Sequence, residues 1–411
     1  MLGGGPMNQT ITREKLACLE LSLIEEISRG QAAKWSRRIG SPALIFENLG
    51  KIKTTELIPE IKAEAQRALD ERALLWRCGR MSEKALQVIR SCNEKNIDWI
   101  SLEESMYPEW LRQIADPPVV LYVRGDLKLL HKPCVSVVGS RKAGAYGQKA
   151  AYEIAAEAAK SGFTVVSGMA MGVDACAHKG ALDALGATAA VMPCGLDLCY
   201  PKCNTWLYHR ICQNGVAISE YPPGCKAEKW HFVERNRLVS GLSLATVVAQ
   251  AGPKSGSIRT AQLAAEQGRE VFGVPGDIFD LEYLGVHNLI QDGANVLTSP
   301  KGLTRALTGQ AEIRMHSERK LGHTVTFEAK RKSLEINMID EEALRKDKEE
   351  NRRKKAGESL WLYEKIDEFG CLPEKLCELT GCGAQKVQQA ITLLEMQGLI
   401  KRDANQRIIK A

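Results

Sequence analysis

The fold is decided by the stretch Val135-Ser-Val-Val-Gly-Ser-Arg141, in which a short apolar run ends abruptly in small and polar residues. The helix-length segment 145–160 follows, and a second apolar run then begins at Phe163. Apolar runs of this length without polar alternation are typical of strands that are buried on both faces of a sheet. We therefore predict a βαβ unit, in which a helix connects two parallel strands.

The same pattern recurs along the chain, and it predicts an α/β domain with an extended Rossmann-like parallel sheet. Val119 to Val123 adds one more expected strand ahead of the pattern. In such sheets the ligand binds beyond the carboxyl ends of the strands, which is where every break in the pattern falls. The further apolar runs, each followed by a glycine-rich or proline-containing break, are 163–167, 187–192, 216–219, 244–248 and 271–274.

Several of these breaks carry groups that bind phosphate. A helix that starts directly after a strand exposes unpaired N–H groups at the positive end of its dipole, and an arginine can hold a phosphate through two parallel hydrogen bonds. So many donors on one edge exceed the needs of a mononucleotide and favour a groove that follows a nucleic-acid backbone. The candidate DNA- and phosphate-binding residues are Gly139, Ser140, Arg141, Gly168, Lys202, Asn204, Arg235, Asn236, Arg237, Lys254, Ser255 and Ser257.

A purely structural role stays open for the same residues. Arg235 and Arg237 could lie on a helix face and pair with Glu234 and Glu228. The Gly-Ser turns could serve only tight packing between a strand and the following helix.

Two common nucleotide motifs are missing from the sequence. Gly139, Gly144 and Gly147 do not have the Gly-x-Gly-x-x-Gly spacing of a dinucleotide-binding turn, and no acid ends the second strand. The Gly-Lys-Ser/Thr ending of a Walker A loop is also missing. We therefore expect neither NAD binding nor ATP hydrolysis, and no cofactor.

Composition narrows the class of protein. The 411 residues carry a net charge of +6 and are 44% hydrophobic, which suits a globular chain of more than one domain and permits an anionic partner. No apolar run reaches the roughly 18 residues of a membrane helix, and Met1 to Met7 lacks signal-peptide features. The 13 cysteines include no Cys-x-x-Cys pair, and the spacing of Cys194, Cys199 and Cys203 matches no zinc template. We expect a cytoplasmic protein with reduced thiols, no membrane partner and no metal site.

The chain divides into four parts by composition and periodicity. Leu16, Leu19, Leu23 and Ile27 have the spacing of a buried helical stripe near the amino end. Near the carboxyl end, three short helices and two apolar pairs around a polar turn at 403–406 are typical of a winged helix. We expect, in order, a helical module similar to SAM or helix-hairpin-helix domains, a Rossmann-like domain, a charged linker and a winged helix, at residues 10–92, 100–305, 306–355 and 356–411.

The two flanking parts carry weak DNA-binding signals. A helix-hairpin-helix turn needs Gly-x-Gly, whereas Ile27-Ser-Arg-Gly30 has one glycine, so a packing role is favoured for the helical module. DNA contact and protein contact stay equally open for the winged helix, because the outward face of its third helix has a single positive charge. The residues expected on that face are Gln385, Lys386, Gln388 and Gln389.

A set of motifs occurs in order between Tyr107 and Thr298: Gly139-Ser-Arg141, Ser167-Gly-Met-Ala-Met-Gly-Val-Asp174, Tyr200-Pro-Lys-Cys-Asn204, Phe232-x-x-Arg-Asn-Arg237, Ser240-Gly-Leu-Ser243, Ser255-Gly-Ser-Ile-Arg-Thr-Ala261, Arg269-Glu-Val-Phe-Gly-Val-Pro-Gly276 and Gly285-x-x-Asn-Leu-Ile290. Together they resemble the DNA-processing protein A family. The resemblance implies a protein that binds single-stranded DNA, commonly as a homodimer, and that is not an enzyme. It also implies protection of incoming strands in natural transformation and help in loading the RecA recombinase. The implied DNA pocket comprises Gly139, Ser140, Arg141, Lys202, Arg235, Asn236 and Arg237.

An enzyme of the related phosphoribohydrolase group is the main alternative. Those enzymes place a glutamate shortly after a Gly-Thr pair, and when Gly256-Ser257 is laid on that pair, Thr260 occupies the position of the glutamate. The cleavage needs a nearby negative group, so the alternative loses its main support. Asp174 is better explained as a helix cap and His178 as a structural residue. A nucleotide-sensing adaptor whose winged helix binds a protein is a third reading.

Overall fold

The computed structural model describes residues 11–49, 57–58, 61–308, 359–363, 365–366, 371–396, 400–402 and 408–410. The chain forms two compact units, residues 1–335 and 336–411, which are treated separately below. Most of the expected charged linker at 306–355 lies outside the described residues. No helix within the described ranges is both long and apolar enough to cross a membrane.

A nine-stranded sheet organises the described part of the larger unit, in the order β1-β2-β6-β5-β4-β3-β7-β8-β9. The seven strands from β6 to β9 are parallel, and β1 and β2 extend the sheet antiparallel from β6. The strands are β1 (Asp98–Ser101), β2 (Val120–Gly125), β3 (Cys134–Val138), β4 (Thr164–Ser167), β5 (Thr188–Met192), β6 (Val216–Ser219), β7 (Ala245–Val248), β8 (Glu270–Gly273) and β9 (Asn295–Val296).

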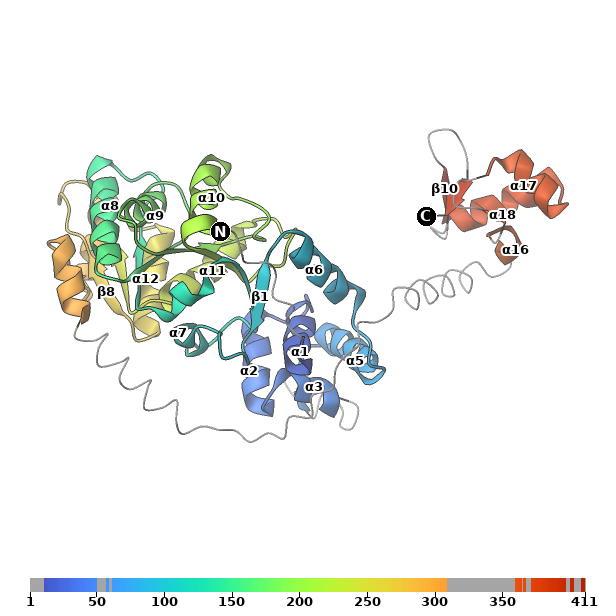
Figure 1. Cartoon of the computed structure of the whole chain (residues 1–411), viewed down its shortest axis with the longest axis horizontal. Helices are drawn as coiled ribbons and strands as arrows, with labels where there is room; N and C mark the ends of the chain where they lie inside the picture. Colours follow the sequence, from blue (N-terminus) through green and yellow to red (C-terminus); the bar gives the residue numbers. More distant parts are fainter. Residues whose placement is uncertain are drawn as a thin grey trace, which may run out of the picture. The chain divides into compact units, whose positions relative to one another are not determined.

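Helices cover both faces of this sheet. The helices α8, α9 and α10 follow β3, β4 and β5 and pack side by side in the upper part of Figure 1, while α11 packs on α12. Right-handed crossovers in the two winding directions place these two groups on opposite faces. The elements are α7 (Glu109–Arg112), η1 (Leu127–His131), α8 (Ala145–Lys160), α9 (Val173–Asp183), η2 (Lys202–Asn204), α10 (Thr205–Asn214), α11 (Lys229–Gly241), α12 (Gly256–Glu266), η3 (Leu281–Tyr283) and α13 (Leu284–Gln291).

The winding direction reverses at β3. From β3 the chain adds β4, β5 and β6 on one side, and it then returns to add β7 and β8 on the other side. The helices that follow β3 and β7 therefore lie on opposite faces of the sheet. The space between the carboxyl ends of these two strands is the usual location of a ligand crevice in an open α/β sheet.

The predicted α/β fold is confirmed, and the seven expected strands lie within one or two residues of β2 to β8. Residues 145–160 form α8, as the spacing predicted. Two strands were not anticipated, β1 and β9. Asp98–Ser101 continues directly from a helix-forming segment, and Asn295–Val296 is too short for a periodicity to be recognised.

A helical module precedes β1 within the same unit. Leu16, Leu19, Leu23 and Ile27 are all buried, which agrees with the expected stripe. Arg37 donates hydrogen bonds to the backbone carbonyls of Arg112, Ile114 and Ala115 and so fastens the module to the segment before β2. The helices are α1 (Arg13–Ser22), α2 (Arg29–Ile39), α3 (Pro42–Asn48), α5 (Ala63–Arg77) and α6 (Glu83–Glu94).

The smaller unit has the arrangement of a winged helix. Its described elements are α16 (Leu360–Tyr363), α17 (Pro373–Thr380), α18 (Ala384–Met396) and the antiparallel pair β10 (Ile400–Arg402) and β11 (Ile408–Lys410). The core combines residues from the helices with one from each strand, including Leu362, Ile366, Leu376, Val387, Ile391, Leu394, Ile400 and Ile408. The expected wing turn at 403–406 lies outside the described residues.

Candidate nucleic-acid interface

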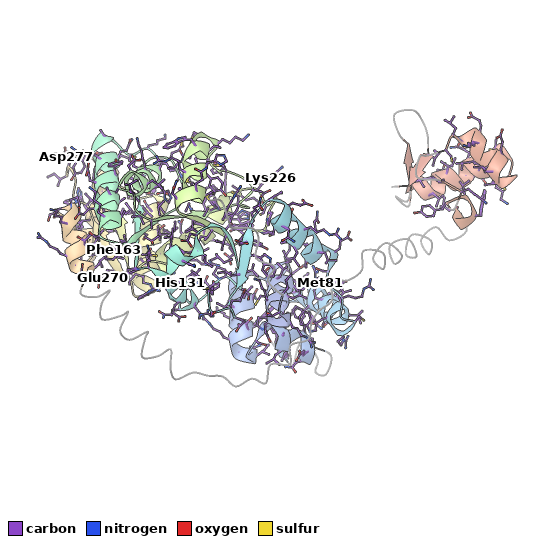
Figure 2. The ribbon with its side chains drawn as sticks, in the orientation of Figure 1. Met81, His131, Phe163, Lys226, Glu270 and Asp277 are labelled. Atoms are coloured by element: carbon purple, nitrogen blue, oxygen red, sulfur yellow. The ribbon has the colours of Figure 1, made fainter. Side chains whose placement is uncertain are left out.

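The breaks that follow the parallel strands meet along one edge of the sheet, the carboxyl edge. In Figure 2, Lys226 and Asp277, which follow β6 and β8, lie on the upper side of the larger unit. His131, Phe163 and Glu270, which lie at the amino ends of strands, are on the lower side. The fold therefore brings the predicted phosphate-binding turns to a common edge, although they are far apart in the sequence.

Two of these turns are joined at the centre of the carboxyl edge. The backbone N–H of Ser140, after β3, donates to the carbonyl of Gln250, after β7, at 2.7 Å. The Gln250 side chain accepts from the N–H of Gly144 at 2.9 Å, next to the start of α8. A Cβ on Gly139 would stand 2.7 Å from the Gln250 carbonyl oxygen, so only glycine fits there. Tight packing and an open helix start therefore coexist in this turn.

The second turn presents a cation and a capped helix. Ser255 is the N-cap of α12, and its hydroxyl accepts from the N–H of Ser257. Lys254 is exposed directly before it, whereas Ser257 is buried. The side chain of Asn236, from α11, reaches the same turn and donates to the carbonyl of Gly256 at 3.4 Å.

A cluster of one cation and two aromatic rings lies beside the β3 turn. Arg141 is exposed, and its guanidinium carbon is 5.0 Å from the ring centroid of Phe232. Phe232 meets the ring of Tyr200 edge-on, with centroids 5.3 Å apart. Lys202 is exposed two residues beyond Tyr200. Sequence reasoning had selected Arg141 and Lys202 but not the rings, whose signal was their position beside predicted cations.

Asn204 has a structural role in this arrangement. Its side chain is buried, and it donates to the carbonyls of Met169 and Ala170 at 3.0 and 3.3 Å. These bonds tie the segment after β5 to the loop between β4 and α9. Asn204 therefore positions Lys202 without presenting its own amide to a ligand.

Arg235 was expected on the surface, but the structure places it inside. Only 4% of the residue is exposed, and its guanidinium donates to the carbonyls of Gly168 and Val191, at the ends of β4 and β5. Burial lowers the pKa of Arg235; the charge of Asp174 opposes this shift, and the charge of Arg141 adds to it. The Arg235 cation thus lies beneath the carboxyl edge and acts on the site through the backbone it holds.

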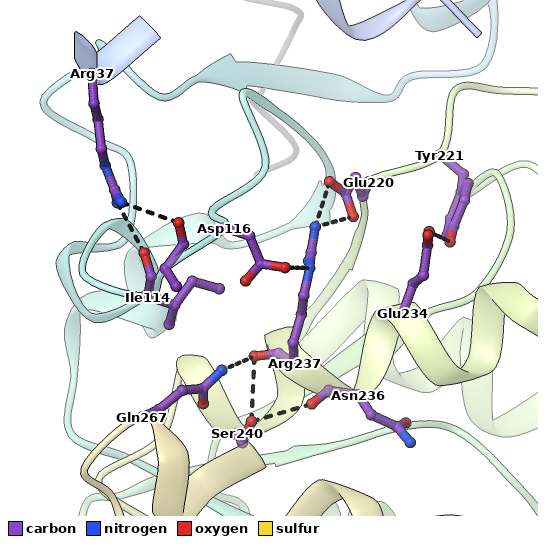
Figure 3. A network of polar contacts seen from close by, with 11 residues as sticks. Arg37, Ile114, Asp116, Glu220, Tyr221, Glu234, Asn236, Arg237, Ser240 and Gln267 are labelled. Carbon is purple, nitrogen blue, oxygen red and sulfur yellow. Dashed lines mark hydrogen bonds and ion pairs between the residues drawn. The ribbon is translucent and has the colours of Figure 1, made fainter. Parts of the chain in front are cut away.

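Arg237 is also buried, in a different part of the unit (Figure 3). It donates two bonds of 2.8 Å to the carboxylate of Glu220 and one of 3.0 Å to Asp116. Although burial alone would lower its pKa, the charge of Glu220 raises the pKa of Arg237. Arg237 is therefore ion-paired, as the structural interpretation predicts, but its partners are Glu220 and Asp116 instead of Glu234 and Glu228. Glu234 instead accepts from the hydroxyl of Tyr221, and Glu228 caps α11.

The expected set therefore divides in two. Gly139, Ser140, Arg141, Gly168, Lys202, Asn236 and the 254–257 turn lie along the carboxyl edge, where the carbonyl of Gly168 is held by Arg235. The side chains of Asn204, Arg235 and Arg237 are internal, which corrects the expectation that two guanidinium groups of α11 face a ligand. Helix α11 contacts β5, α7 and α12, and residues two apart on a helix point in different directions, so Arg235 and Arg237 enter different buried surroundings.

The acids and the histidine near this edge are engaged with the protein. Asp174 is the second residue of α9, after the N-cap Gly172, and its carboxylate accepts from the N–H of Ala170 at 3.2 Å. Burial raises the pKa of Asp174. His178 is fully buried and bonds to the Thr188 hydroxyl at 2.7 Å, and burial lowers its pKa to about 3. His178 is therefore neutral, in agreement with a structural role.

Burial favours the protonated form of the thiols in the cysteine region. Burial raises the pKa of Cys194 to about 12, and burial also raises the pKa of Cys199, whereas metals bind thiolates. In the part of the chain that the structure describes, no three Cys, His, Asp or Glu side chains are placed to hold a metal ion.

Comparison with known proteins agrees with the fold and the motifs. The DNA processing protein DprA of Bacillus subtilis is 40% identical over 225 residues, which cover 54% of this chain and 76% of that protein. The DNA processing protein DprA of Streptococcus pneumoniae is 42% identical over 199 residues, which cover 48% and 70% of the two chains. The X-ray structure of DprA from Streptococcus pneumoniae matches with a TM-score of 0.60 and 31% identity, over 72% of this chain and 98% of that one.

The family match covers the whole sheet. Residues 98–308, just over half of the chain, match the family described as DNA recombination-mediator protein A. This range begins at β1 and ends at residue 308, the last described residue of the larger unit. The motif-based resemblance is thereby confirmed, and the chain belongs to the DNA recombination-mediator protein A family.

Proposed function

We propose that this chain binds single-stranded DNA through the carboxyl edge and handles incoming strands in natural transformation and recombination. The observation that carries the proposal is the grouping of Arg141, Phe232, Tyr200 and Lys202 beside an open helix start. Cations and helix starts hold phosphates regardless of sequence. Exposed rings offer stacking surfaces to unpaired bases, which a duplex keeps stacked on one another.

The experiment is a salt series of binding to an oligothymidylate, compared with duplex of equal length. Affinity for the single strand should fall steeply as salt rises, because each phosphate contact releases counterions. Arg141→Ala should weaken binding and flatten the salt dependence by about one counterion. Lys160→Ala is the matched control, since Lys160 is an exposed cation at the far end of α8. Equal affinity of wild type and Arg141→Ala, or equal binding of duplex, would contradict the proposal.

We infer further that the chain is not an enzyme. A phosphoribohydrolase needs a carboxylate beside the ribose. The Thr260 hydroxyl at the corresponding position donates to the carbonyl of Gly256, Asp197 is bound by Lys95, and Glu220 is bound by Arg237. The direct assay measures release of free base from nucleoside monophosphates. Turnover above the level of a heat-denatured sample would overturn this inference.

A homodimer is part of the same proposal. Strand β9 is the outer edge of the sheet, with Val296 half exposed, and such an edge can pair with another chain. A groove of about 500 Å³ next to it is lined from α12 and α13. Sedimentation of wild type and Val296→Lys tests this. A dimer that the substitution converts to monomer supports the proposal, and a monomeric wild type at high concentration contradicts it.

Help in loading the RecA recombinase completes the proposal. The measurement is the rate of RecA filament formation on single-stranded DNA already coated with a single-strand binding protein. The wild-type chain should shorten the lag before filament formation. The Arg141→Ala variant should leave this lag unchanged, because loading requires the chain to hold DNA. An unchanged lag with the wild-type chain would contradict the loading role but would not contradict the proposal of DNA binding.

A further inference from the structure

Two tryptophans occupy matching positions at the carboxyl edge. Trp206 is the second residue of α10 and Trp230 is the second residue of α11, so both rings stand in the first turn of a helix that starts at this edge. They remain 52% and 49% exposed. Tryptophan is usually highly buried, and two half-exposed rings on one edge therefore indicate a contact surface.

Both tryptophans lie on chain segments that contribute to the site described above. Trp206 follows η2, which the Asn204 side chain ties to the β4–α9 loop. Trp230 stands two residues before Phe232. Because the rings of Phe232 and Tyr200 meet, the two segments that carry the tryptophans lie next to each other. The two tryptophans therefore stand at two neighbouring helix starts, on the segments that also carry the Tyr200 and Phe232 rings.

The neighbours of each ring restrict its orientation. The Arg210 guanidinium lies 6.0 Å from the Trp206 ring centroid and is itself paired with Asp183 at 3.1 Å. The Trp230 indole N–H donates to the carboxylate of Glu228, and its ring meets Tyr221 edge-on. A ring held in place loses little conformational entropy when a flat partner stacks on it.

The charges around the rings suit a polyanion. Lys202 precedes Trp206, and Lys226 and Lys229 precede Trp230; all three side chains are exposed, and they outnumber Glu228, the carboxylate bonded to the Trp230 indole. Cations alternating with half-exposed rings are the combination that holds single strands, in which phosphates meet the cations and unpaired bases stack on the rings. A surface built for an apolar protein partner would have fewer charges at its centre.

We propose that Trp206 and Trp230 form a base-stacking subsite, which extends the bound strand beyond Arg141 and adds to the preference for unpaired DNA. This rests on the proposed function, and it assigns the tryptophans a role that phosphate contacts cannot replace. Each ring should take one base of any type, since every base has a face that can stack.

The test compares an oligothymidylate with an abasic strand of equal length and charge, each titrated against the full chain. Wild type should bind the oligothymidylate more tightly. Trp206→Ala and Trp230→Ala should each reduce affinity for it about 5- to 100-fold and leave affinity for the abasic strand nearly unchanged. Trp206→Phe and Trp230→Phe should retain most of the affinity, which separates stacking from loss of fold.

Two controls separate this subsite from the phosphate site. Arg141→Ala should weaken binding of both strands, and Leu185→Ala, an exposed apolar side chain after the end of α9, should weaken neither. Tryptophan variants that bind the oligothymidylate like wild type, or that lose affinity equally for both strands, refute the subsite while the proposed function stands. A wild-type chain that binds neither strand refutes both.

Discussion

Gly168 lies directly against the guanidinium of Arg235. Its carbonyl accepts from Nη1 at 2.6 Å, and a Cβ at this position would stand 2.5 Å from Nη2. Nη1 also donates to the carbonyl of Val191. The missing side chain at 168 thus lets one buried cation join the ends of two neighbouring strands beneath the carboxyl edge.

Gly168→Ala should therefore destabilise the protein. The guanidinium that the added methyl group meets is buried, and its Nη1 is bonded to two backbone carbonyls. Because a shift of the guanidinium would break these bonds, we expect a loss of about 1–3 kcal/mol in the free energy of unfolding. Urea denaturation measures it. Gly252→Ala is the control, since a Cβ there would meet its nearest atoms at an ordinary 3.7 Å. Equal stability of the two variants would show that Arg235 adjusts freely.

Arg237→Ala should be among the most damaging single changes. It removes the Nη2 group that bonds both carboxylate oxygens of buried Glu220, and removal of one member of a buried pair costs about 3–5 kcal/mol. The double variant Arg237→Met with Glu220→Leu should cost less than Arg237→Ala alone, because no buried charge is abandoned. Thermal unfolding of the three proteins checks the order, and a double variant that is the least stable of them would contradict it.

His178 makes stability depend on pH. Its pKa is about 3 in the folded chain and 6.5 for the free side chain, so the unfolded chain binds the proton first as pH falls. Stability from this group is complete above pH 6.5 and declines toward pH 3. We expect a loss of about 2–3 kcal/mol by roughly pH 4.5. His178→Gln should remove this decline. The free energy of unfolding of both proteins is measured by urea denaturation at each pH, and the difference between them cancels the contributions of other groups such as Asp174. The same pH dependence of stability in wild type and His178→Gln would show that His178 does not cause the decline.

Arg37→Ala should loosen the helical module without affecting DNA binding. The guanidinium gives its bonds to three backbone carbonyls, at 2.8 Å for Arg112, 2.9 Å for Ile114 and 3.2 Å for Ala115. Because these bonds are partly open to solvent, we expect a loss of about 1–2 kcal/mol. Faster limited proteolysis between α2 and β2 would report the loosening. Lys34→Ala, an exposed residue on the same helix, should change neither proteolysis nor DNA affinity.

Strand content was predictable from the sequence because buried parallel strands are unalternating and their breaks are rich in glycine. The order of the strands was not predictable, because no local feature of the sequence indicates that β7 pairs with β3 instead of with β6. The existence of a shared carboxyl edge followed from the pattern. Which of its side chains would face solvent depended on the layers packed over α11, and these are set by distant parts of the chain.

Arg237 shows where local reasoning failed. The acids weighed as its partners were Glu228 and Glu234, which are close in sequence. The actual partners are Glu220, before α11, and Asp116, in the segment before β2. The aromatic part of the site was missed for a similar reason, because Tyr200 and Phe232 become neighbours only after the β5–α10–β6 crossover has formed. Aromatic residues close in sequence to predicted cations were the signal that could have found them.

The hydrogen bond between the Ser140 amide and the Gln250 carbonyl forms late in synthesis of the chain. The two halves of the central turn are translated far apart in time. A nascent chain that has emerged only as far as α11 lacks β7, and with it the support for the β3 turn. We therefore expect a ribosome-bound intermediate to lack the proposed DNA-binding turn until β7 has been synthesised.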